Sequence, residues 1–566
     1  MNNDSTHGLS RRSFLKGGVV AGVMATIGLA GCAPASAPTS KDSEGKAVAA
    51  EQTSGDWLGE APTISDDQVT ATHEADVIVV GGGTSGMFAA CAAVEEGAKC
   101  ILVEKQSADI TGDGIRDTLG AIGSKQQLAN DDNPDKFAVI NELTRQSNGY
   151  GDDRLYRVWA DNSGEAIDWY ADRLKEAGSE FLHEVDNHEH ELRYPIYDVG
   201  HSIQWGTVEY SKQYASGVLR DYATGLGLET HYDTALISLI KDGDRVTGIY
   251  AQGPDGIVRY NAKNGVIMCT GGYASNTEMM QALQPESEAL CCIRKSFPSC
   301  VGAGIKACLW AGGVMDDKHT AMIFDRGGIK PDATDASEGQ LFWMGSQPFL
   351  KVDLEGNRFT NESGSYDHIL HASLNLPGQT YCMVWDANYQ EDIKRFDTHG
   401  CSRLFPHANG TDPVMPMEVI DGMNEGLMAD GYIVEADTVE GLAEKLNIPA
   451  DAFAATVKRY NELADKGEDP DFGKEAFRLS HLDTPPFRGI RMHGGYLICT
   501  MDGIKINENM NVIDEQGAPI PGLYCAGDCS GGYFADSYPN LLAGAAAGRS
   551  VTFGRRAGQL AAKATA

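Results

Sequence analysis

The 566-residue sequence is poor in positive charge. Lysine and arginine together number 46, whereas aspartate and glutamate number 80, so the formal net charge at pH 7 is −34. A surface with this excess of carboxylates repels phosphate backbones and anionic lipid headgroups. Nucleic acid is therefore excluded as an expected partner. The 42% share of hydrophobic residues is ordinary for a folded chain, with room for two or three domains.

The N-terminal apolar segment lacks the length of a membrane span. Residues 17–31 form a run of about fifteen residues, and a spanning helix needs roughly twenty. Arg11 and Arg12 precede this run, which is typical of a twin-arginine export signal. The string LAGC that ends at Cys32 resembles a lipoprotein box, so we expect lipidation of Cys32 and a place on the extracytoplasmic face of the cell membrane; a retained anchor is the alternative. The composition of residues 33–71 predicts a flexible tether.

Two motifs of redox centres are absent. The thirteen cysteines include no C-x-x-C-H string, the attachment motif of covalent haem, and no C-x-x-C-x-x-C string. The cysteines between residues 291 and 308 match no iron–sulfur spacing, and disulfide connectivity stays open. The histidine-rich stretch at residues 183–190 has an acidic context and is interpreted as a solvated loop, so no metal site is predicted.

A strand, a tight glycine turn and a helix are predicted from residue 76 to residue 97. The apolar run DVIVV leads into GGGTSG and then into MFAACAAVEEG, which is helical in composition. Gly81 permits the turn, Gly83 lets the backbone approach a pyrophosphate, and Gly86 lets helix and strand pack closely. A dinucleotide diphosphate would then lie on the amides at the helix N-terminus, beside Thr84 and Ser85.

A second strand, KCILVEK, follows the helix and carries a carboxylate at its end. Glu104 lies eighteen residues after Gly86, where a carboxylate can accept hydrogen bonds from ribose hydroxyls, and Lys105 follows it. NAD and FAD share this fingerprint, so the choice between them depends on the remainder of the chain.

Two distant segments, GVIMCTGGYASN and IPGLYCAGDCSGG, resemble the FAD-binding pattern of the fumarate reductase and succinate dehydrogenase flavoprotein family. A third, TGDGIRDTLGAIGS, is similar to the family's flavin-contacting loop. The resemblance covers nearly the whole mature chain and implies FAD as cofactor. The residues that it assigns to FAD are Thr270, Gly271, Gly272, Gly527, Asp528 and Asn540, together with Gly112, Arg116 and Gly120 of the loop.

The same resemblance implies an α/β fold, a Rossmann-like doubly wound FAD-binding domain interrupted by an α+β capping domain. In the family, substrate lies at the junction of the two, where a cap excludes water and must open for substrate. The expected divisions are a signal at 1–32, a linker at 33–71, the first FAD-binding part at 72–318, the capping domain at 319–490 and the C-terminal return at 491–566.

Family members that reduce fumarate hold its two carboxylates with arginines and histidines, and such a dianion needs cationic partners. By alignment of motifs, four of these charged or titratable positions are replaced by uncharged residues. They fall on Ile323, Gln390, Ile498 or Cys499, and Leu541. We therefore expect a neutral, partly apolar substrate rather than a dicarboxylate.

Tyr538 is the first candidate for a proton donor. It lies in ADSYPNLLAG, which resembles the Tyr-Pro segment of 3-ketosteroid dehydrogenases, where a tyrosine polarises a carbonyl; packing under the flavin is the alternative. Tyr366 stands where many relatives have a relay arginine, and Glu362, Tyr366 and His368 could form a replacement relay or a solvated loop. Arg358 is either catalytic or an ion-pair tie between the cap and the FAD-binding domain.

These expectations combine into a flavin-dependent reductase of an activated C=C bond, acting as an anaerobic terminal reductase. Because neither a haem motif nor a flavodoxin-like module is recognised, electrons would come from a membrane cytochrome or quinol oxidoreductase near a lipidated Cys32. The alternatives left open are a 3-ketosteroid-type dehydrogenase, reductive cleavage of an activated C–O bond, and a non-catalytic electron relay.

Overall fold

The computed structural model describes residues 56–108, 118–186, 190–204, 215–294, 300–333 and 335–564. Residues Met1–Trp57 form one unit and Leu58–Ala566 a second, and the architecture below is that of the second. The predicted signal, Cys32 and most of the predicted linker lie outside the described residues. Within the described part of the chain, no helix has both the length and the apolar character that a membrane crossing requires.

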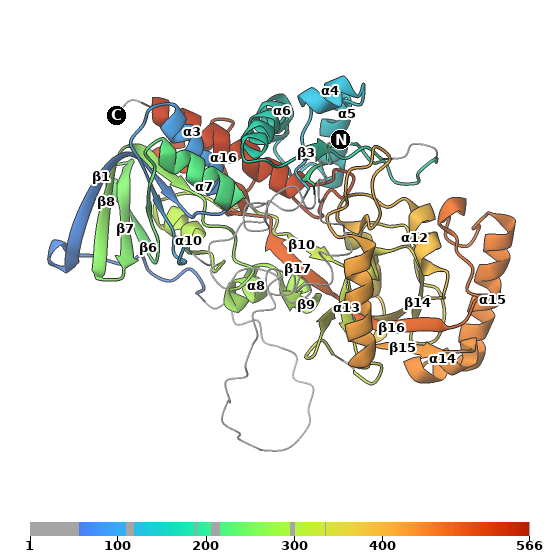
Figure 1. Ribbon diagram of the computed structural model, residues 1–566. Coiled ribbons are helices and arrows are strands. Elements are labelled where there is room, and N and C mark those ends of the chain that lie inside the picture. The colour runs from blue at the N-terminus through green and yellow to red at the C-terminus, as the bar shows by residue number, and fades with distance from the viewer. Residues whose placement is uncertain are drawn as a thin grey trace, which may run out of the picture. The chain divides into compact units, whose positions relative to one another are not determined.

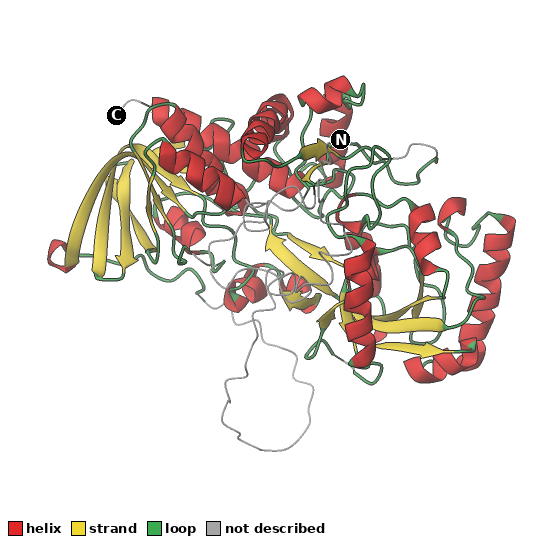
Figure 2. Ribbon diagram, viewed as in Figure 1, coloured by secondary structure: helices red, strands yellow, loops and turns green. Residues whose placement is uncertain are grey.

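A mixed eight-stranded sheet with a parallel centre forms the larger layer (Figures 1 and 2). Its order is β18-β19-β8-β1-β2-β5, and β7 and β6 extend it from β8. The strands are β1 (Val69–Val80), β2 (Cys100–Val103), β5 (Glu229–His231), β6 (Ala235–Asp242), β7 (Arg245–Gly253), β8 (Gly256–Met268), β18 (Asn511–Ile513) and β19 (Pro519–Cys525). Val80 of β1 pairs with Val103 of β2 and with Met268 of β8. The carboxyl ends of these parallel strands are therefore level, which is where such sheets bind ligands.

Two helices from opposite ends of the sequence pack against each other beside this sheet. They are α3 (Thr84–Glu95) and the C-terminal α16 (Ala545–Lys563), blue and red in Figure 1. A Cβ on Gly554 would lie 2.3 Å from the carbonyl oxygen of Ser85, and one on Gly558 would lie 2.1 Å from that of Ala89. The glycines allow the two helix backbones to come into contact. The C-terminal helix α16 therefore packs tightly on α3, the helix that follows β1.

The remaining helices and hairpin of this part surround the sheet. They are α4 (Lys125–Ala129), α5 (Lys136–Gln146), α6 (Asp153–Glu176), α7 (Ala215–Gly225), α8 (Thr277–Leu283), α9 (Pro285–Ala289), α10 (Ala303–Trp310), and the hairpin β3 (Phe181–His183) with β4 (His201–Ile203).

Two smaller sheets lead from this part into the cap. The first has the order β10-β17-β9, formed by β10 (Ala321–Phe324), β17 (Gly495–Thr500) and β9 (Cys291–Arg294). The second contains β11 (Gly327–Ile329), β12 (Gln340–Leu341), β13 (Leu350–Asp353), β14 (Thr380–Trp385), β15 (Ile433–Ala436) and β16 (Phe487–His493). Residues 325–326 connect β10 to β11, and Gly494 alone connects β16 to β17. The predicted division after residue 490 falls inside β16, because this strand keeps pairing with β14 as far as His493.

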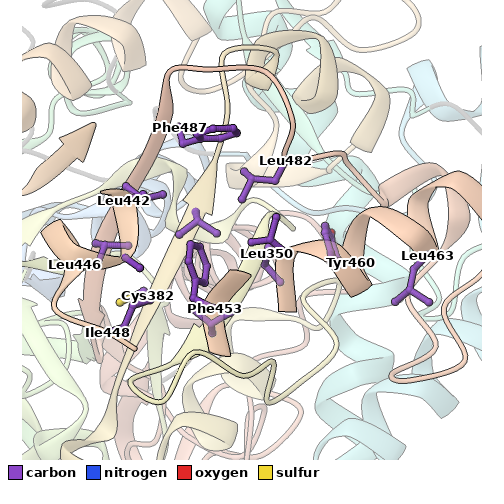
Figure 3. Close-up of a cluster of buried hydrophobic side chains, with 14 of the residues drawn as sticks. Leu350, Cys382, Leu442, Leu446, Ile448, Phe453, Tyr460, Leu463, Leu482 and Phe487 are labelled. Atoms are coloured by element: carbon purple, nitrogen blue, oxygen red, sulfur yellow. The ribbon is translucent and has the colours of Figure 1, made fainter. Parts of the chain in front are cut away.

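The cap has its own hydrophobic core on one side of the second sheet (Figure 3). Side chains of β13 and β14, such as Leu350 and Cys382, meet α14 (Val439–Leu446) and α15 (Ala450–Lys466). Phe453 and Leu463 of α15 are 0% exposed, and burial of side chains of this size contributes about 1.5–3 kcal/mol each. The other cap helices are α11 (Tyr366–Ser373), α12 (Tyr389–Phe396) and α13 (Met417–Ala429). The predicted α/β fold class is confirmed.

Candidate active site

A cavity of about 430 Å³ opens at the carboxyl ends of β1, β2 and β8. Most of the residues predicted to bind a dinucleotide line it, although they come from four distant segments. They are Gly81, Gly83, Thr84, Ser85, Glu104, Lys105, Thr270, Gly271, Gly272, Gly527 and Asp528. The cavity wall also includes Thr234, Ala235 and Leu236, which sequence reasoning missed because nothing in their local pattern distinguishes them from an ordinary strand start.

The glycine turn has the geometry that each glycine was predicted to provide. Gly81 has a φ of +100°, which glycine adopts without strain. A Cβ on Gly86 would lie 1.8 Å from the carbonyl oxygen of Gly81, so only glycine permits this contact between helix and strand. A Cβ on Gly83 would meet no protein atom within 4 Å, and Gly83 lines the cavity directly before α3. Backbone amides at this helix start are thus open to a diphosphate.

Glu104 is held in place by two backbone N–H groups. The N–H of Gly82 donates to its Oε2 at 2.6 Å, and the N–H of Gln106 donates to its Oε1 at 2.8 Å. Each carboxylate oxygen can accept a further hydrogen bond. The geometry therefore fits a ribose at this end of the cavity.

Asp528 also lines the cavity, and its carboxylate is paired with an arginine that the sequence did not reveal. Arg549 of α16, 0% exposed, donates from Nη2 to the Asp528 carboxylate at 2.8 Å. Burial raises the pKa of Asp528, and Arg549 opposes this rise. Cys499, on β17, hydrogen-bonds the same carboxylate and lines the cavity.

Two of the predicted cofactor residues, Gly120 and Asn540, do not line the cavity. Gly112 and Arg116 are outside the described residues. The N–H of Gly120 donates to the carbonyl oxygen of Gly544 at 2.9 Å, which places the end of the flavin-contacting loop beside the start of α16. Asn540 is not among the residues that line the cavity, and its carbonyl oxygen bonds the Nε2 of His399 in the cap at 2.5 Å.

The family described as FAD binding domain matches residues 76–540 of this chain. The chain belongs to this family. The vinyl phenol reductase of Lactiplantibacillus plantarum is 27% identical over 88% of this chain and 98% of its own length. The digoxin reductase of Eggerthella lenta is 26% identical over 98% of this chain and 96% of its own length. A solved structure of the open conformation of a flavocytochrome c3 fumarate reductase matches with a TM-score of 0.62 at 25% identity, over 87% of this chain and 79% of that one.

Membership in the FAD binding domain family confirms the predicted cofactor, FAD, and the predicted enzyme class, an FAD-dependent oxidoreductase. The cavity agrees with this assignment on its own geometry. It joins an open helix N-terminus, an oriented ribose-type carboxylate and a buried Asp528–Arg549 pair in one hollow.

In this FAD-binding oxidoreductase, Tyr538 lies between the cofactor cavity and the cap. Its side chain is buried, and burial raises its pKa well above the ordinary value, so the phenol stays protonated at neutral pH. The backbone N–H of Ala546, a residue of the cavity wall, bonds its hydroxyl. Cys401 and Tyr366 of the cap and Cys499 of the cavity act on it electrostatically. A protonated phenol at this position can donate a proton.

Tyr366 and Glu362 face different partners. The Tyr366 hydroxyl bonds the Ser402 hydroxyl at 2.9 Å, and its ring packs on Phe324 with centroids 4.3 Å apart. Glu362 precedes α11, whose first residue is Tyr366, so the spacing of four does not place both side chains on one helical face. His368 packs on the ring of Tyr194. A direct Glu362–Tyr366–His368 relay is therefore not formed.

Arg358 is part of a buried ion-pair network inside the cap. It bonds both carboxylate oxygens of Glu362 at 2.8 and 2.9 Å, and those of Asp469 at 3.0 and 3.2 Å. Lys474 lies 3.5 Å from Glu362. Burial alone would raise the pKa of Glu362, but Lys474 and Arg358 lower it. The expectation that Arg358 forms an ion pair between the cap and the FAD-binding part is wrong for these contacts. Both of its hydrogen-bonded partners, Glu362 and Asp469, belong to the cap.

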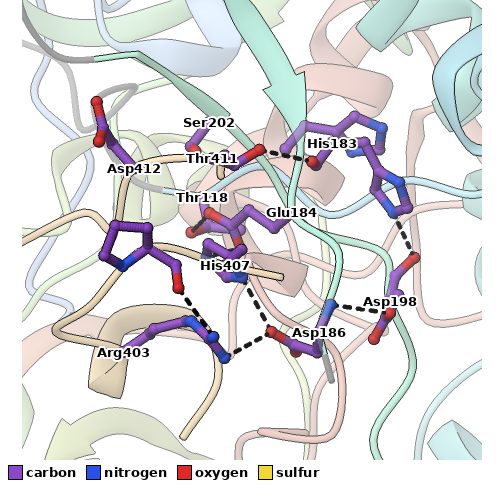
Figure 4. Close-up of polar contacts among 12 residues, drawn as sticks. Thr118, His183, Glu184, Asp186, Asp198, Ser202, Arg403, His407, Thr411 and Asp412 are labelled. Atoms are coloured by element: carbon purple, nitrogen blue, oxygen red, sulfur yellow. Dashed lines mark hydrogen bonds and ion pairs between the residues drawn. The ribbon is translucent and has the colours of Figure 1, made fainter. Parts of the chain in front are cut away.

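A different polar network joins the cap to the FAD-binding part (Figure 4). Asp186 accepts from His407 Nδ1 at 2.9 Å and from Arg403 Nη1 at 3.2 Å. Burial would raise the pKa of Asp186, but His407 and Arg403 lower it. His183, whose backbone carbonyl binds Thr411 and Asn409, is 1% exposed. The interpretation of this stretch as a solvated loop is wrong for His183, because the cap covers it; His188 lies outside the described residues.

Three of the four positions read as uncharged line the cavity or are buried, and the fourth, Gln390, is partly exposed. Ile498 and Cys499 line the cavity, and Ile323 and Leu541 are buried. Gln390 donates to Asp421 of the cap at 2.7 Å. Sequence reasoning also missed the buried cation Arg326, which lies two residues after the end of β10 and packs against Tyr366.

Proposed function

We propose that this oxidoreductase reduces an activated C=C bond of a neutral or weakly polar small molecule. Reduced FAD, when bound, supplies the hydride. The observation that carries the proposal is the junction of cavity and cap, where the buried phenol of Tyr538 has the thiols of Cys401 and Cys499 and the ring of Tyr366 as neighbours, with Arg326 as a single cation beyond them. Some curated relatives at this level of identity are named for fumarate, but two that match over nearly their whole length are named for vinyl phenol and digoxin, which supports a substrate other than fumarate.

Three features of the chain would have separate roles in the proposed reaction: a proton donor, an apolar surface and the cap. Tyr538 donates the proton from a phenol that burial keeps neutral, and the backbone N–H of Ala546 orients it. The aromatic residues Phe324 and Tyr366 offer flat apolar surface to a conjugated substrate. The cap excludes water from the reacting carbon atoms.

The cellular setting is part of the same proposal. The sequence Arg11-Arg12 and the string ending at Cys32 support export and lipid anchoring at the extracytoplasmic face of the membrane. There the enzyme would act as a terminal reductase in anaerobic respiration. A membrane cytochrome or quinol oxidoreductase would supply its electrons.

Anaerobic visible spectroscopy tests the activity. The holoenzyme is reduced with a viologen dye and mixed with enones, steroids, vinyl phenols, cinnamates, fumarate and urocanate. We expect one class of neutral unsaturated compound, and not fumarate, to restore the oxidised flavin spectrum. Reoxidation by fumarate would overturn the proposed substrate class, and a flavin that no compound reoxidises would favour dehydrogenation, C–O cleavage or an electron relay.

A further inference from the structure

Arg326 is a buried cation with an unused donor. The side chain is 0% exposed; its Nε donates to Ser346 Oγ at 2.9 Å and its Nη2 to the carbonyl oxygen of Cys401 at 2.8 Å. Its Nη1 is buried and has no hydrogen-bond partner among the described residues. A buried guanidinium with a free N–H is costly unless an acceptor completes it.

The nearby carboxylate does not complete Arg326. Asp325 accepts from Ser346 Oγ at 2.7 Å and lies 3.9 Å from Nζ of Lys351, which is itself 0% exposed. Within the described part of the chain, no carboxylate oxygen lies within 4.0 Å of the Arg326 nitrogens. Asp325 is thus shared electrostatically between Lys351 and Arg326, and it leaves the Nη1 donor of Arg326 without a hydrogen bond.

A second unused donor belongs to a ring that packs against the Arg326 guanidinium. The Cζ of Arg326 lies 4.1 Å from the ring centroid of Trp343, 4.5 Å from that of Phe324 and 5.8 Å from that of Tyr366. The Nε1 of Trp343 is also buried without a hydrogen-bond partner among the described residues. Indole nitrogens that are buried normally find an acceptor. Two stacked side chains therefore present N–H groups that no described acceptor satisfies.

The two donors lie on the cap side of the candidate active site. Met322 of β10 lines the cofactor cavity, and Arg326 follows two residues after the end of that strand. The carbonyl that Arg326 holds belongs to Cys401, and the ring beside it is Tyr366; both residues act electrostatically on Tyr538. Tyr538, the proton donor of the proposed function, and Arg326 are thus neighbours of the same two cap residues.

Another buried arginine shows that burial alone does not explain Arg326. Arg491 is 4% exposed and also has no carboxylate within 4.0 Å among the described residues. Its Nη2 binds the carbonyl oxygens of Leu446 and Asn447, at the C-terminus of α14, and its Nη1 binds that of Ala333. Both terminal nitrogens of Arg491 are used, although its Nε has no hydrogen-bond partner among the described residues, and a cation at a helix C-terminus is stabilised by the helix dipole. Arg491 is therefore a structural arginine and a matched control.

We propose that Arg326 and Trp343 form an oxyanion site that binds the conjugated oxygen of the substrate. This inference rests on the proposed function and narrows its substrate class to molecules with one oxygen, a carbonyl or a phenol, in conjugation with the C=C bond. A single cation fits one developing negative charge and does not fit a dicarboxylate.

The atoms and electrons of the proposed reduction balance when the substrate oxygen lies beside Arg326. For an enone, hydride adds to the β-carbon, the electron pair of the C=C bond moves onto the carbonyl oxygen, and an enolate forms beside Arg326. A proton from Tyr538 then adds to the α-carbon, and the electron pair returns to restore the carbonyl. The product gains one hydride and one proton. For a vinyl phenol the order is reversed. The phenolate oxygen beside Arg326 donates its electron pair through the ring as a proton adds to the terminal carbon, which gives a quinone methide. Hydride then adds to the benzylic carbon, and the electron pair returns to the oxygen as phenolate.

Ligand binding tests the site without turnover. The oxidised holoenzyme is titrated with 4-nitrophenol, which absorbs visible light strongly only as the phenolate, and with 4-nitrotoluene, which has no ionisable oxygen. The variants are Arg326→Met, Arg326→Lys, Trp343→Phe and the control Arg491→Met. We expect the wild type to bind 4-nitrophenol as the anion at a pH below the pKa of the free phenol.

Arg326→Met should weaken 4-nitrophenol binding by about 10–100-fold, the value of a charge-assisted hydrogen bond, and abolish the phenolate spectrum. Trp343→Phe keeps the ring and should weaken binding about 5–10-fold. Arg326→Lys should retain part of the effect, and 4-nitrotoluene should bind all variants alike. Arg491→Met should lower the melting temperature without changing the preference for 4-nitrophenol.

Equal binding of both probes to the wild type, or an unchanged phenolate spectrum in a folded, flavin-loaded Arg326→Met protein, would overturn the oxyanion site. Failure of the proposed function is a separate result, because it would appear as a flavin that no substrate reoxidises while 4-nitrophenol still binds as the anion.

Discussion

Replacing Arg358 by methionine separates a structural role from a catalytic one. In the wild type this side chain makes four hydrogen bonds to Glu362 and Asp469, and the side chains of these three residues are 6%, 0% and 0% exposed. Methionine keeps much of the apolar stem and removes all four bonds. Glu362 then retains Lys474, while Asp469 retains backbone N–H donors such as that of Lys474.

The cost follows from leaving buried carboxylates with too few partners. Removing one member of a buried ion pair costs roughly 3–5 kcal/mol. If the cap unfolds as a unit of about 150–250 residues, the melting temperature should fall by roughly 6–20 °C. Because the partners of Arg358 belong to the cap and not to the cofactor cavity, the folded fraction should keep FAD and turn over within about threefold of the wild-type rate.

The pH dependence has a definite sign. Arg358 and Lys474 hold the pKa of Glu362 below its ordinary value of 4.5 against the effect of burial. A depressed carboxyl pKa stabilises the fold above the unfolded-state pKa, and this stability is lost as pH falls through the folded-state pKa. The wild type should therefore lose stability below about pH 4.5, and Arg358→Met should lose less over the same range.

The assay is thermal unfolding followed by circular dichroism from pH 3 to pH 7, together with steady-state kinetics at a temperature where the variant is folded. The control is Arg459→Met, which removes an exposed ion pair to Asp471 and should leave the melting temperature unchanged. A variant with the wild-type melting temperature and a turnover reduced more than 100-fold would refute the structural interpretation and place Arg358 at the substrate.

Three further changes test other parts of the site. Gly83→Ala should preserve the fold but lose most bound FAD, measured by the visible spectrum beside circular dichroism, because the added methyl group meets no protein atom and projects at the cavity; full FAD content would count against the diphosphate position. Tyr538→Phe should keep FAD and lower kcat by about 10²–10⁴-fold in rapid kinetics, and undiminished turnover would remove Tyr538 as proton donor. Asp186→Asn should raise hydrogen exchange in residues 403–412 at neutral pH, where the depressed pKa keeps the carboxylate charged, and unchanged exchange would contradict its role in holding the cap.

The nucleotide end of the site could be predicted from the sequence because its chemistry is local. Gly81, Gly83 and Gly86 act within one turn, and Glu104 ends the next strand, so spacing alone defines their geometry. The same holds for Thr270 to Gly272 at the end of β8. These residues lie together because the parallel strands end level with one another.

The catalytic end could not be predicted in the same way. Arg326 and Trp343 are adjacent only through the packing of two cap strands, and Arg549 reaches Asp528 from another element. The pairing of Glu362 with Tyr366 failed for a local reason, since the helix begins after Glu362 and the periodicity of a helix does not apply to it. The sequence does not show that the Nη1 of Arg326 is buried without a hydrogen-bond partner, because this depends on the packing of the folded chain.

Gly494 is the single residue between the last strand of the cap sheet and β17. Its φ is +53°, and a Cβ there would lie 2.2 Å from the carbonyl oxygen of Leu290. In the described part of the chain, residues 325–326 form the second strand-to-strand crossing, between β10 and β11. The two crossings define an axis, and we expect the cap to rotate about this axis rather than slide along the cavity. Arg326 lies on that axis. A substrate oxygen bound there would move little while the cap rotates. The oxygen could therefore bind before the cap encloses the double bond of the substrate.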